Sequence, residues 1–512
     1  MWNPFARRGG GPGEPVIAAA TFVIGIGVMA IEITASRLLA PYFGASMFVW
    51  TSLIVTVLVA LSVGYFFGGR FASRGAGLEI VGFLSCGAAA LLVFGMLVIP
   101  SFSTAVSGLL VGLSTASIAL FLGSLVVTMI VFACPVFLMA MSGPILLKAW
   151  SAHGDVGAIS GRYFAISTIG SVIGTVAPTL VLVPTIGARG TIYAISGMFL
   201  LLGLILAVKW RKLALTMTLA LALVPLALPH VPKDVVMERE SPYQLIRVAQ
   251  DGDRRYLIFN EGSGIQSVYV PGHERTGFYY DYLGLLPLMH PKATGETHRG
   301  LIIGLAGGTA AVRYPSMVSD AARIELTGVE VDPAVIDTAR RWFALDETGV
   351  RVVNADGRVY LQTTRENYDS ILVDAYSTQL YIPPHLATKE FYTLAKTRLA
   401  AGGVLAMNVN APSDESRLLR ALTATAASVF GHVIVVPVSG SWNHLVLASD
   451  EPFDIEAAAR RVPEDYGDIR ESLLASSVVP HDPAAEVFTD DRAPVEFLTD
   501  SMIVAQAFGH AK

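Results

Sequence analysis

Long apolar runs dominate the first part of the chain and give way to mixed polar and apolar sequence near residue 230. A helix needs about 20 mostly apolar residues to cross the roughly 30 Å hydrocarbon core of a bilayer. We therefore predict a transmembrane domain of about seven helices over residues 1–230. The predicted helices cover residues 15–40, 47–69, 78–100, 116–142, 158–183, 188–208 and 213–229.

Shorter signals refine this membrane domain. Segment 103–115 is apolar but short, which fits a re-entrant piece, an interfacial piece or half of an eighth span. Proline and glycine residues, including Pro100, Pro144 and Gly187, mark the expected helix ends. Gly170 and Gly174 form a GxxxG pair, which allows two apolar helices to approach closely. This pair predicts packing and says nothing about function.

The charges of the loops predict an orientation. Basic residues gather on one side of a seven-helix arrangement, which places the N-terminus in the cytoplasm of a multi-pass protein of the cell (inner) membrane. An odd number of spans would put the C-terminal part outside the cytoplasm, so its side stays open. The basic residues that carry this argument are Arg7, Arg8, Arg70, Arg74, Lys148, Arg162, Lys209, Arg211 and Lys212.

The pattern changes after residue 230. Residues 233–270 alternate between apolar and polar positions and are broken by turn signals such as Asp251-Gly252-Asp253. This alternation is typical of antiparallel strands. We therefore expect a small β-meander, followed by a helix at about 274–289, in a region spanning residues 231–290.

From residue 291 to 512 short apolar strands alternate with helical segments. This order predicts βαβ units and a parallel sheet, an α/β Rossmann-like fold. The expected helices include 333–344 and 388–400. The expected strands cover residues 301–304, 324–330, 350–353, 368–374 and 403–409.

Polar signals follow four of these strands. A glycine-rich turn at 304–308 ends the first, and Glu330, Asp356 and Asp374 end the next three. Ligands of open α/β sheets bind at the carboxyl ends of the strands. A single carboxylate there often caps a helix. Four signals in register instead predict a nucleoside-binding site.

Composition narrows the class of protein. The chain is 53% hydrophobic and 15% charged, against about 25% charged residues in soluble domains. The net charge of −5 argues against a nucleic-acid partner. Cys86 and Cys134 are the only cysteines and lie in apolar runs, so they offer neither a disulfide framework nor metal-ligand spacing.

Over residues 236–500 the sequence resembles the spermidine synthase (polyamine aminopropyltransferase) family, and its apolar half resembles the membrane part of the bacterial membrane-fused group. Each matching run alone is common, whereas the set is specific. The runs are Tyr243-Gln244, Gly264-Ile265-Gln266-Ser267, residues 304–309, Val329-Glu330-Val331-Asp332, Ala355-Asp356-Gly357, Val373-Asp374-Ala375-Tyr376, Glu390-Phe391-Tyr392, Thr489-Asp490-Asp491 and Ala493-Pro494-Val495-Glu496.

The resemblance implies roles for individual residues. Asp374 would orient the attacking amine and take its proton. Gln244 and Glu330 would bind the ribose of the cofactor, and Asp356 would accept from the adenine amino group. The remaining implied cofactor-binding residues are Gly304, Gly307, Gly308 and Gly357, and Gln266 would line the substrate channel.

Several positions depart from the family pattern. Gly307 and Ser377 stand where aspartates are usual, and Leu285 replaces a histidine. Nucleoside recognition therefore looks intact, while amine recognition looks altered. A different acceptor pocket could be built from Tyr279, Asp281, Tyr376 and Tyr381.

The resemblance implies a membrane-bound enzyme that transfers an aminopropyl group from decarboxylated S-adenosylmethionine to a polyamine or related amine, without a metal. Two alternatives stay open. One is an S-adenosylmethionine-dependent methyltransferase on the same fold. The other is a non-enzymatic transporter or sensor that binds polyamines or nucleosides. The expected partners are the lipid bilayer and a small amine, with a homodimer as one open assembly state and no nucleic acid.

Overall fold

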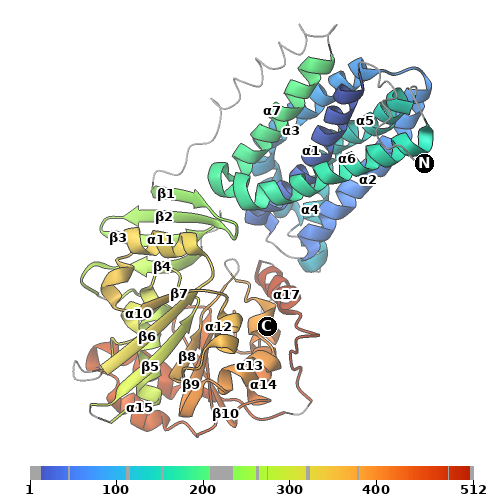
Figure 1. Ribbon diagram of the computed structural model, residues 1–512. Coiled ribbons are helices and arrows are strands. Elements are labelled where there is room, and N and C mark those ends of the chain that lie inside the picture. The colour runs from blue at the N-terminus through green and yellow to red at the C-terminus, as the bar shows by residue number, and fades with distance from the viewer. Residues whose placement is uncertain are drawn as a thin grey trace, which may run out of the picture. The chain divides into compact units, whose positions relative to one another are not determined.

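The computed structural model of the chain forms two compact units, Met1–Val231 and Pro232–Lys512 (Figure 1). The second unit holds both the predicted small region 231–290 and the predicted domain 291–512. Arg7, Arg8, Lys209, Arg211 and Lys212, on which the predicted orientation partly depends, lie outside the described residues. The structure describes residues 13–43, 47–110, 116–151, 155–207, 234–260, 264–273, 275–293, 295–318, 323–376, 380–482 and 484–507.

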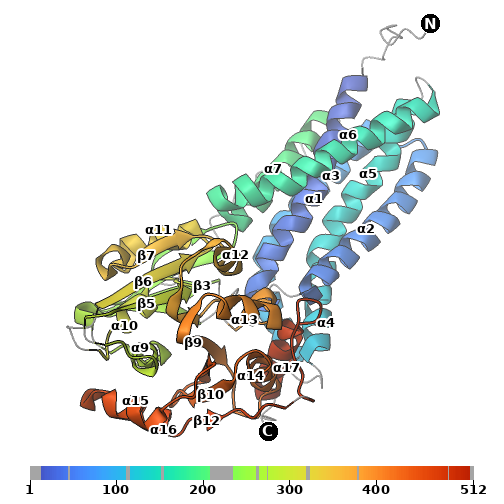
Figure 2. The same ribbon diagram turned by 60° about the horizontal axis from the view of Figure 1, so that its bottom comes forward.

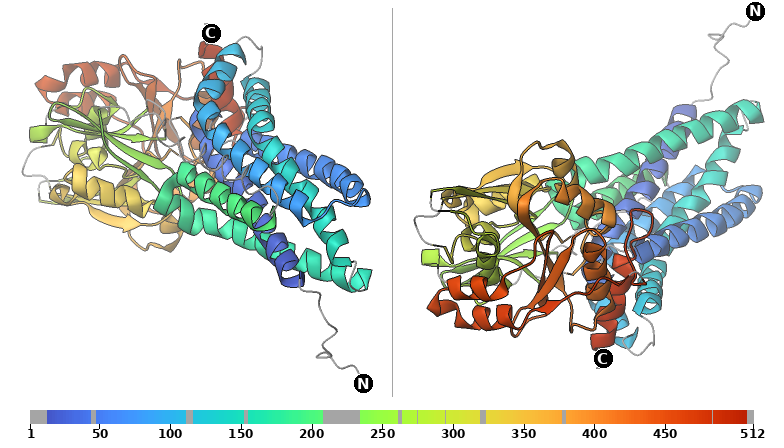
Figure 3. Two further views of the ribbon diagram at one scale, coloured as in Figure 1. Left: turned by 90° about the horizontal axis from the view of Figure 1, so that it is seen from above. Right: turned by 90° about the horizontal axis from the view of Figure 1, so that it is seen from below.

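The described part of the first unit consists of helices joined by short connections. Its apolar side chains pack inward as one core and also face outward in large numbers, as expected of helices surrounded by lipid. Figure 3 shows these helices, blue to green, gathered in one bundle. They are α1 (Glu14–Phe43), α2 (Met47–Ser73), α3 (Leu78–Leu110), α4 (Ala116–Thr128), the π-helix η1 (Met129–Ala133), α5 (Cys134–Ser151), α6 (Val156–Ala177), the π-helix η2 (Pro178–Leu182) and α7 (Val183–Leu206).

Within the described residues, five helical stretches are long and apolar enough to cross a membrane, rather than the seven expected. The predicted stretch 213–229 lies outside the described residues. The predicted helices 158–183 and 188–208 fall in one stretch, Val156–Leu206. That stretch is interrupted at Gly187, whose φ of 75° and ψ of 168° are not helical, so the expected break is present as a kink.

Two expected helix ends were wrong. Pro100 lies within α3 and Pro144 within α5. A proline removes one backbone hydrogen bond, and packed apolar helices tolerate this because neighbouring groups and local π-type turns adjust. Consequently residues 103–110 of the short apolar segment continue α3 instead of forming a separate piece.

Small residues set the closest helix contacts. α1 packs along α6, α2 along α5, and α3 along α7. A Cβ placed on Gly174 would lie 2.1 Å from the carbonyl oxygen of Ile26, and one on Gly170 would lie 2.4 Å from that of Phe22. The GxxxG pair therefore lets α6 lie directly against the backbone of α1, as predicted.

The second unit begins with a four-stranded antiparallel sheet in the order β1-β2-β3-β4. This sheet matches the predicted β-meander. Ile246, Val248, Leu257 and Phe259 form its buried face and pack against α11 (Pro333–Trp342). The strands are β1 (Val235–Glu240), β2 (Leu245–Asp251), β3 (Arg254–Phe259) and β4 (Ile265–Tyr269).

A larger mixed sheet follows, in the order β12-β10-β11-β9-β8-β5-β6-β7. The strands from β9 to β7 run parallel, as the alternation of strands and helices predicted, and β10, β11 and β12 pair antiparallel at one edge. The strands are β5 (Thr297–Ile303), β6 (Arg323–Glu330), β7 (Arg351–Asn354), β8 (Tyr368–Val373), β9 (Leu399–Asn410), β10 (His432–Pro437), β11 (Asn443–Ser449) and β12 (Ser477–Val478).

Helices cover both faces of this sheet (Figure 2). One face carries α12 (Gly357–Thr363), α13 (Lys389–Lys396), α14 (Arg417–Ala427) and α17 (Val495–Ala507). The other carries the 3-10 helix η6 (Tyr279–Leu285), α9 (Leu286–Met289), α10 (Thr309–Arg313), α15 (Ile455–Arg461) and α16 (Gly467–Leu474). Alternate residues of β5 and β8 point to opposite faces, so the strands are buried on both sides, which explains their continuous apolar runs.

Two predicted helices differ in extent. The helix expected at 274–289 is the 3-10 helix η6 followed by the short α9. The helix expected at 388–400 ends at Lys396, and β9 already begins at Leu399. The structure thus has a shorter crossover between β8 and β9 than the sequence indicated.

Candidate functional site

A cavity of about 300 Å³ opens at the carboxyl ends of the parallel strands. Side chains from the small sheet, from η6 and from the loops after β5, β6, β7 and β8 line it. Nine of the residues singled out from the sequence are among them: Gln244, Gln266, Tyr279, Gly304, Glu330, Asp356, Gly357, Asp374 and Tyr376.

The loops after β5 and β8 touch at Gly304. The amide of Asp374 donates to the carbonyl of Ile303 at 2.9 Å, which draws the two strand ends together. A Cβ on Gly304 would lie 2.4 Å from the carbonyl oxygen of Asp374, and the φ of this glycine is +90°. Only glycine fits both the left-handed conformation and this close approach. Gly304 thereby brings the backbone turn next to Asp374.

Asp374 lies just after β8 and is partly exposed in the cavity. Its Oδ2 accepts a hydrogen bond of 2.8 Å from the hydroxyl of Tyr279, and its Oδ1 accepts one of 2.9 Å from the side-chain amide of Asn408. Burial raises the pKa of Asp374 to about 6, against the pull of these two donors. A carboxyl group with this pKa can exchange a proton near neutral pH.

Further polar groups hold the partners of Asp374 in place. Asn408 is 1% exposed, and its Oδ1 accepts a 3.0 Å hydrogen bond from Asn443. The hydroxyl of Tyr376 donates to the backbone carbonyl of Asn408 at 2.8 Å. Burial raises the pKa of Tyr279 well above its ordinary value, so its hydroxyl keeps its proton and remains a donor to Asp374.

Glu330 ends β6 and is buried at the cavity wall, 7% exposed. Its Oε2 accepts from the amide of Ala306 at 2.9 Å and its Oε1 from the amide of Asp332 at 3.1 Å. Burial raises the pKa of Glu330, although these backbone amides oppose the rise. The carboxylate is thus fixed in orientation, and each oxygen has a lone pair left for a ligand hydroxyl.

Asp356 follows β7 and caps α12. Its Oδ1 accepts from the amides of Arg358 and Val359 at 2.9 and 3.0 Å, and its Oδ2 lies 3.0 Å from Nε2 of His385. The hydrogen bond with His385 holds the pKa of Asp356 below its ordinary value. Asp356 therefore caps α12 and also lines the cavity. The two interpretations of a carboxylate at this position, a helix cap and a ligand-binding group, are compatible.

The remaining predicted residues of the cavity shape its walls. Gln244 is 8% exposed and follows the turn between β1 and β2, whereas Gln266 lies in β4. A Cβ on Gly357 would lie 2.2 Å from Cγ2 of Ile303. Glycine at this position lets α12 begin directly above the end of β5.

Two predicted glycines lie elsewhere. Gly307 and Gly308 border a separate space of about 20 Å³, and Asp374 is not among the residues that line it. The amide of Gly307 donates to Oγ of Ser267 at 2.8 Å, and a Cβ on Gly307 would lie 2.6 Å from the Cβ of Ser267. The position is therefore filled by the small sheet, which leaves no room for a longer side chain in this arrangement.

Asp281 does not line the cavity, contrary to its expected place in an acceptor pocket. It is 1% exposed, and its Oδ1 lies 2.9 Å from Nε of the buried Arg313. Its carboxylate also accepts from the amides of Thr276 and Gly277 at 3.0 and 2.9 Å. Through its ion pair with Arg313, Asp281 connects η6 to α10.

Sequence reasoning missed Asn408, His385 and Phe259. Asn408 had a visible signal, because it is a polar residue inside the apolar run of β9, where a buried amide needs partners. His385 follows two prolines and lies in the short 3-10 helix η8 (Pro384–Leu386), and no pattern distinguished it. Tyr381 and Ser377 were also named: Tyr381 donates to the buried Asp500, and Ser377 lies outside the described residues.

The arrangement joins three carboxylates with different environments around one cavity. The described residues contain no group of three or more His, Cys, Asp and Glu side chains placed to hold a metal ion. Glu330 and Asp356 are oriented by backbone amides and suit hydrogen bonding to a polar ligand. Asp374, with its raised pKa, suits proton exchange.

Residues 279–450 match the family model of the Spermine/spermidine synthase domain. A probable polyamine aminopropyl transferase of Bifidobacterium longum (strain NCC 2705) is 30% identical over 290 residues, which cover 52% of this chain and 62% of that protein. A polyamine aminopropyltransferase of Vibrio vulnificus (strain CMCP6) is 34% identical over 210 residues, 38% of this chain and 65% of that protein. The chain thus spans less than two thirds of the length of either relative. Among solved structures, a probable spermidine synthase from Corynebacterium glutamicum ATCC 13032 aligns over 51% of this chain and 97% of its own, with a TM-score of 0.38 and 21% identity.

Proposed function

We propose that this chain, which is spermidine synthase-like and carries a spermine/spermidine synthase domain over residues 279–450, is a membrane-bound aminopropyltransferase. The observation that carries the proposal is the meeting of Glu330, Asp356 and Asp374 around one cavity of about 300 Å³. The donor is decarboxylated S-adenosylmethionine, and the acceptor is a polyamine or a related amine.

The donor would lie with its nucleoside along the ends of β6 and β7. Glu330 can accept hydrogen bonds from the two ribose hydroxyls, and Gln244, which lines the same cavity, would assist. Asp356 can accept from the adenine amino group through Oδ2, which His385 now contacts at 3.0 Å. The base would displace this exposed histidine from the oxygen.

The reaction would take place beside Asp374. An amine has an ordinary pKa of roughly 10 and arrives as an ammonium ion. Asp374 accepts a proton from it, the free amine attacks the propyl carbon next to the sulfonium, the new C–N bond forms and the C–S bond breaks. Methylthioadenosine leaves with the electron pair of that bond, and the proton passes from Asp374 to solvent.

Tyr279 and Asn408 are assigned to positioning Asp374. Both donate to the carboxylate, so they favour its ionised form and fix the direction of its remaining lone pairs. The ionised form attracts the ammonium ion, and its pKa of about 6 leaves it able to take the proton as the amine begins to attack.

The membrane assignment rests on five described helical stretches that are long and apolar enough to cross a bilayer. Their outward side chains include Phe66, Phe94, Phe164, Leu180 and Leu201, each more than half exposed. Such a surface would be unstable in water, because burying apolar area supplies about 25 cal/mol per Å². We place the protein in the cell membrane on this ground.

A second function is favoured by one observation, at Gly307. This residue offers no side chain to the donor, and Ser267 occupies the space beside it. Decarboxylated S-adenosylmethionine keeps the amino group of S-adenosylmethionine and lacks its carboxylate, so an acidic side chain would favour the decarboxylated donor, and Gly307 supplies none. The second candidate is therefore an S-adenosylmethionine-dependent methyltransferase that uses the same nucleoside site.

Calorimetric titration of the detergent-purified full chain with decarboxylated S-adenosylmethionine, S-adenosylmethionine and methylthioadenosine tests these alternatives. Tighter binding of the decarboxylated donor supports aminopropyl transfer. Tighter binding of S-adenosylmethionine favours the methyltransferase. Binding of none of the three, by protein that remains monodisperse, overturns the proposal and leaves a non-enzymatic role.

A further inference from the structure

A second and larger cavity, of about 410 Å³, lies at the amino ends of β5 and β6. His298, the second residue of β5, lines it, whereas Ile303 at the other end of the strand lines the cavity that contains Asp374. Five residues of extended chain separate these ends by roughly 17 Å. The two cavities are therefore at opposite edges of the sheet and belong to different sites.

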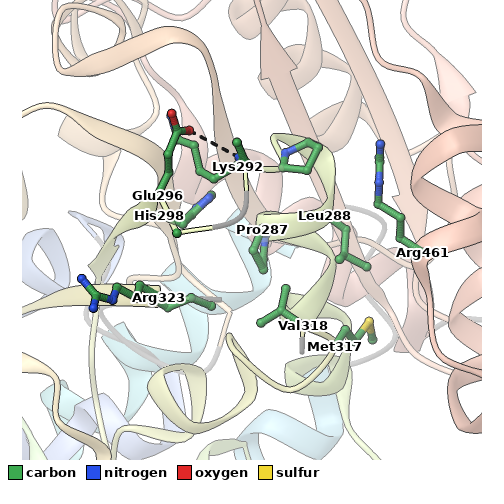
Figure 4. A pocket seen from close by; sticks show the side chains of 13 residues that line it. Pro287, Leu288, Lys292, Glu296, His298, Met317, Val318, Arg323 and Arg461 are labelled. Atoms are coloured by element: carbon green, nitrogen blue, oxygen red, sulfur yellow. Dashed lines mark hydrogen bonds between the residues drawn. The ribbon is translucent and has the colours of Figure 1, made fainter. Parts of the chain in front are cut away.

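The floor of the second cavity is apolar. The side chains that form it come from α9, from the segment after α10 and from the start of β6. Figure 4 shows several of them clustered at the centre of the cavity. They are Pro287, Leu288, Met317, Val318 and Ile324.

Positive charge surrounds this floor. Lys292, Arg323 and Arg461 line the cavity, and Glu296 is the one acidic residue among its described lining residues. Figure 4 shows Arg323 and Arg461 on opposite sides of the apolar cluster. Lys292 is paired with Asp369 at 2.6 Å. The two arginines have no ion pair within the described part of the chain, so their charges are available to a ligand.

One buried polar group completes the wall. His298 is 3% exposed, and its Nε2 lies 2.9 Å from the hydroxyl of Tyr314 and 3.2 Å from that of Ser370. Its Nδ1 is buried and makes no well-formed hydrogen bond within the described residues, although the carbonyl of His290 lies nearby. Burial lowers the pKa of His298 to about 4, so the ring is neutral near pH 7. A neutral imidazole nitrogen suits a polar uncharged contact with a ligand.

We propose that this cavity binds a small anion that carries an apolar group, such as a phosphate monoester or a carboxylate with an aromatic or branched body. The apolar body would pack on Leu288 and Met317, and the anionic group would lie against Arg461, while Arg323 on the opposite side adds positive charge to the wall. The volume falls within the range of small-molecule sites. The charge of the wall excludes polyamines, so this site is distinct in ligand class from the amine site at Asp374.

Calorimetric titration with phenyl phosphate tests the proposal. The full chain in detergent is first saturated with methylthioadenosine, so that the probe cannot report on the cavity at Asp374. We expect phenyl phosphate to bind with one site per chain, and phenol and benzylamine to bind at least tenfold more weakly. Absence of phenyl phosphate binding, or equal binding of the three probes, overturns the proposal.

Variants locate the site. The double substitution Arg323→Gln with Arg461→Gln should weaken phenyl phosphate at least tenfold, and Met317→Trp should fill the cavity and abolish binding. Arg460→Gln is the matched control, because Arg460 neighbours Arg461 in α15 but pairs with the exposed Glu456 at 3.6 Å. Unchanged methylthioadenosine affinity in each variant shows that the unit is folded. Unchanged phenyl phosphate affinity in the double arginine variant would place the anion elsewhere.

Discussion

The side-chain amide of Asn408 donates a 2.9 Å hydrogen bond to Oδ1 of Asp374. Asn408 lies in β9, directly after the apolar run 404–407 and before Val409. Asn443 on the neighbouring β11 holds the other end of this amide at 3.0 Å. Asp374 therefore stands at the end of a chain of buried amides that crosses two strands. Together with the hydrogen bond from Tyr279 to Oδ2, this chain fixes the orientation of the carboxylate and of the lone pairs that remain for a ligand.

The pH dependence of the reaction should follow Asp374. Its ionised form accepts the amine, so the rate should fall as the pH drops through about 6, the pKa of this carboxyl. Asn408→Leu and Tyr279→Phe each remove a donor that favours ionisation. Both should move the acidic limb of the pH–rate profile to higher pH. Tyr282→Phe in the same 3-10 helix is the control, because the Tyr282 hydroxyl contacts the hydroxyl of Ser472 at 3.1 Å and not Asp374. If the acidic limbs of the pH–rate profiles coincide in the unchanged protein and all three variants, Asp374 is not the group that takes the proton.

Asp374→Asn should preserve or raise stability at pH 8 while abolishing turnover. The native pKa of about 6 exceeds the ordinary 3.8, so the contribution of Asp374 to stability is full below about pH 4 and is lost as the pH rises through 6. At pH 8 the buried charge destabilises the fold by up to about 3 kcal/mol. An asparagine has no such charge, and its oxygen can still accept from Asn408 while its NH2 group donates to the hydroxyl oxygen of Tyr279.

Thermal unfolding of the full chain in detergent at pH 4 and pH 8 checks this. The unfolding temperature of the variant should match or exceed that of the unchanged protein at pH 8, and this advantage should disappear near pH 4. Asp337→Asn, on the exposed surface of α11, serves as the control. A variant that is clearly less stable at pH 8 would mean that Asp374 supports the fold rather than straining it.

Glu330→Gln should weaken methylthioadenosine binding about 10- to 100-fold. Each hydrogen bond to a charged carboxylate contributes about 1.5–3 kcal/mol. The glutamine side chain is uncharged and has only one accepting oxygen, so one of the two ribose hydroxyls would lose its acceptor. Glu325→Gln is the matched control on the same strand, because Glu325 is exposed and pairs with Arg299 at 3.5 Å. Equal methylthioadenosine dissociation constants for the two variants would show that Glu330 does not bind the ribose.

The sequence predicted this part of the site because of a geometric rule. Glu330, Asp356 and Asp374 each follow a parallel strand, and the carboxyl ends of parallel strands meet at one edge of a sheet. No such rule placed Asp281. Its partner Arg313 lies 32 residues further along the chain and reaches it only through the packing of η6 on α10. A carboxylate that looks available in sequence can thus be neutralised by a distant arginine.

The helices of the first unit show the same limit. Six of the seven predicted helices overlap the five long apolar helical stretches of the described residues, because a run of about 20 apolar residues is a simple signal. Their ends were less predictable, because Pro100 and Pro144 lie inside α3 and α5, and a proline does not by itself end an apolar helix. Gly187, in contrast, has a non-helical conformation and marks a real break.

Close packing of α6 on α1 should depend on Gly174. Gly174→Leu places a side chain where the Ile26 backbone now lies, with the Cβ only 2.1 Å from the carbonyl oxygen, so the helices must separate. Gly161→Leu in the same helix is the control, because no atom lies within 4 Å of its Cβ. We expect a lower unfolding temperature in detergent for Gly174→Leu only. Similar values for the two variants would contradict the observed packing.

Release of methylthioadenosine tests the central claim most directly. The full chain in detergent is incubated with decarboxylated S-adenosylmethionine and a panel of amines, and methylthioadenosine and the aminopropylated amine are quantified by mass spectrometry. We expect both products in equal amounts from the unchanged protein and neither from Asp374→Asn, which should still bind methylthioadenosine. Donor that binds but yields no products with any amine, or equal product from Asp374→Asn, would contradict the account.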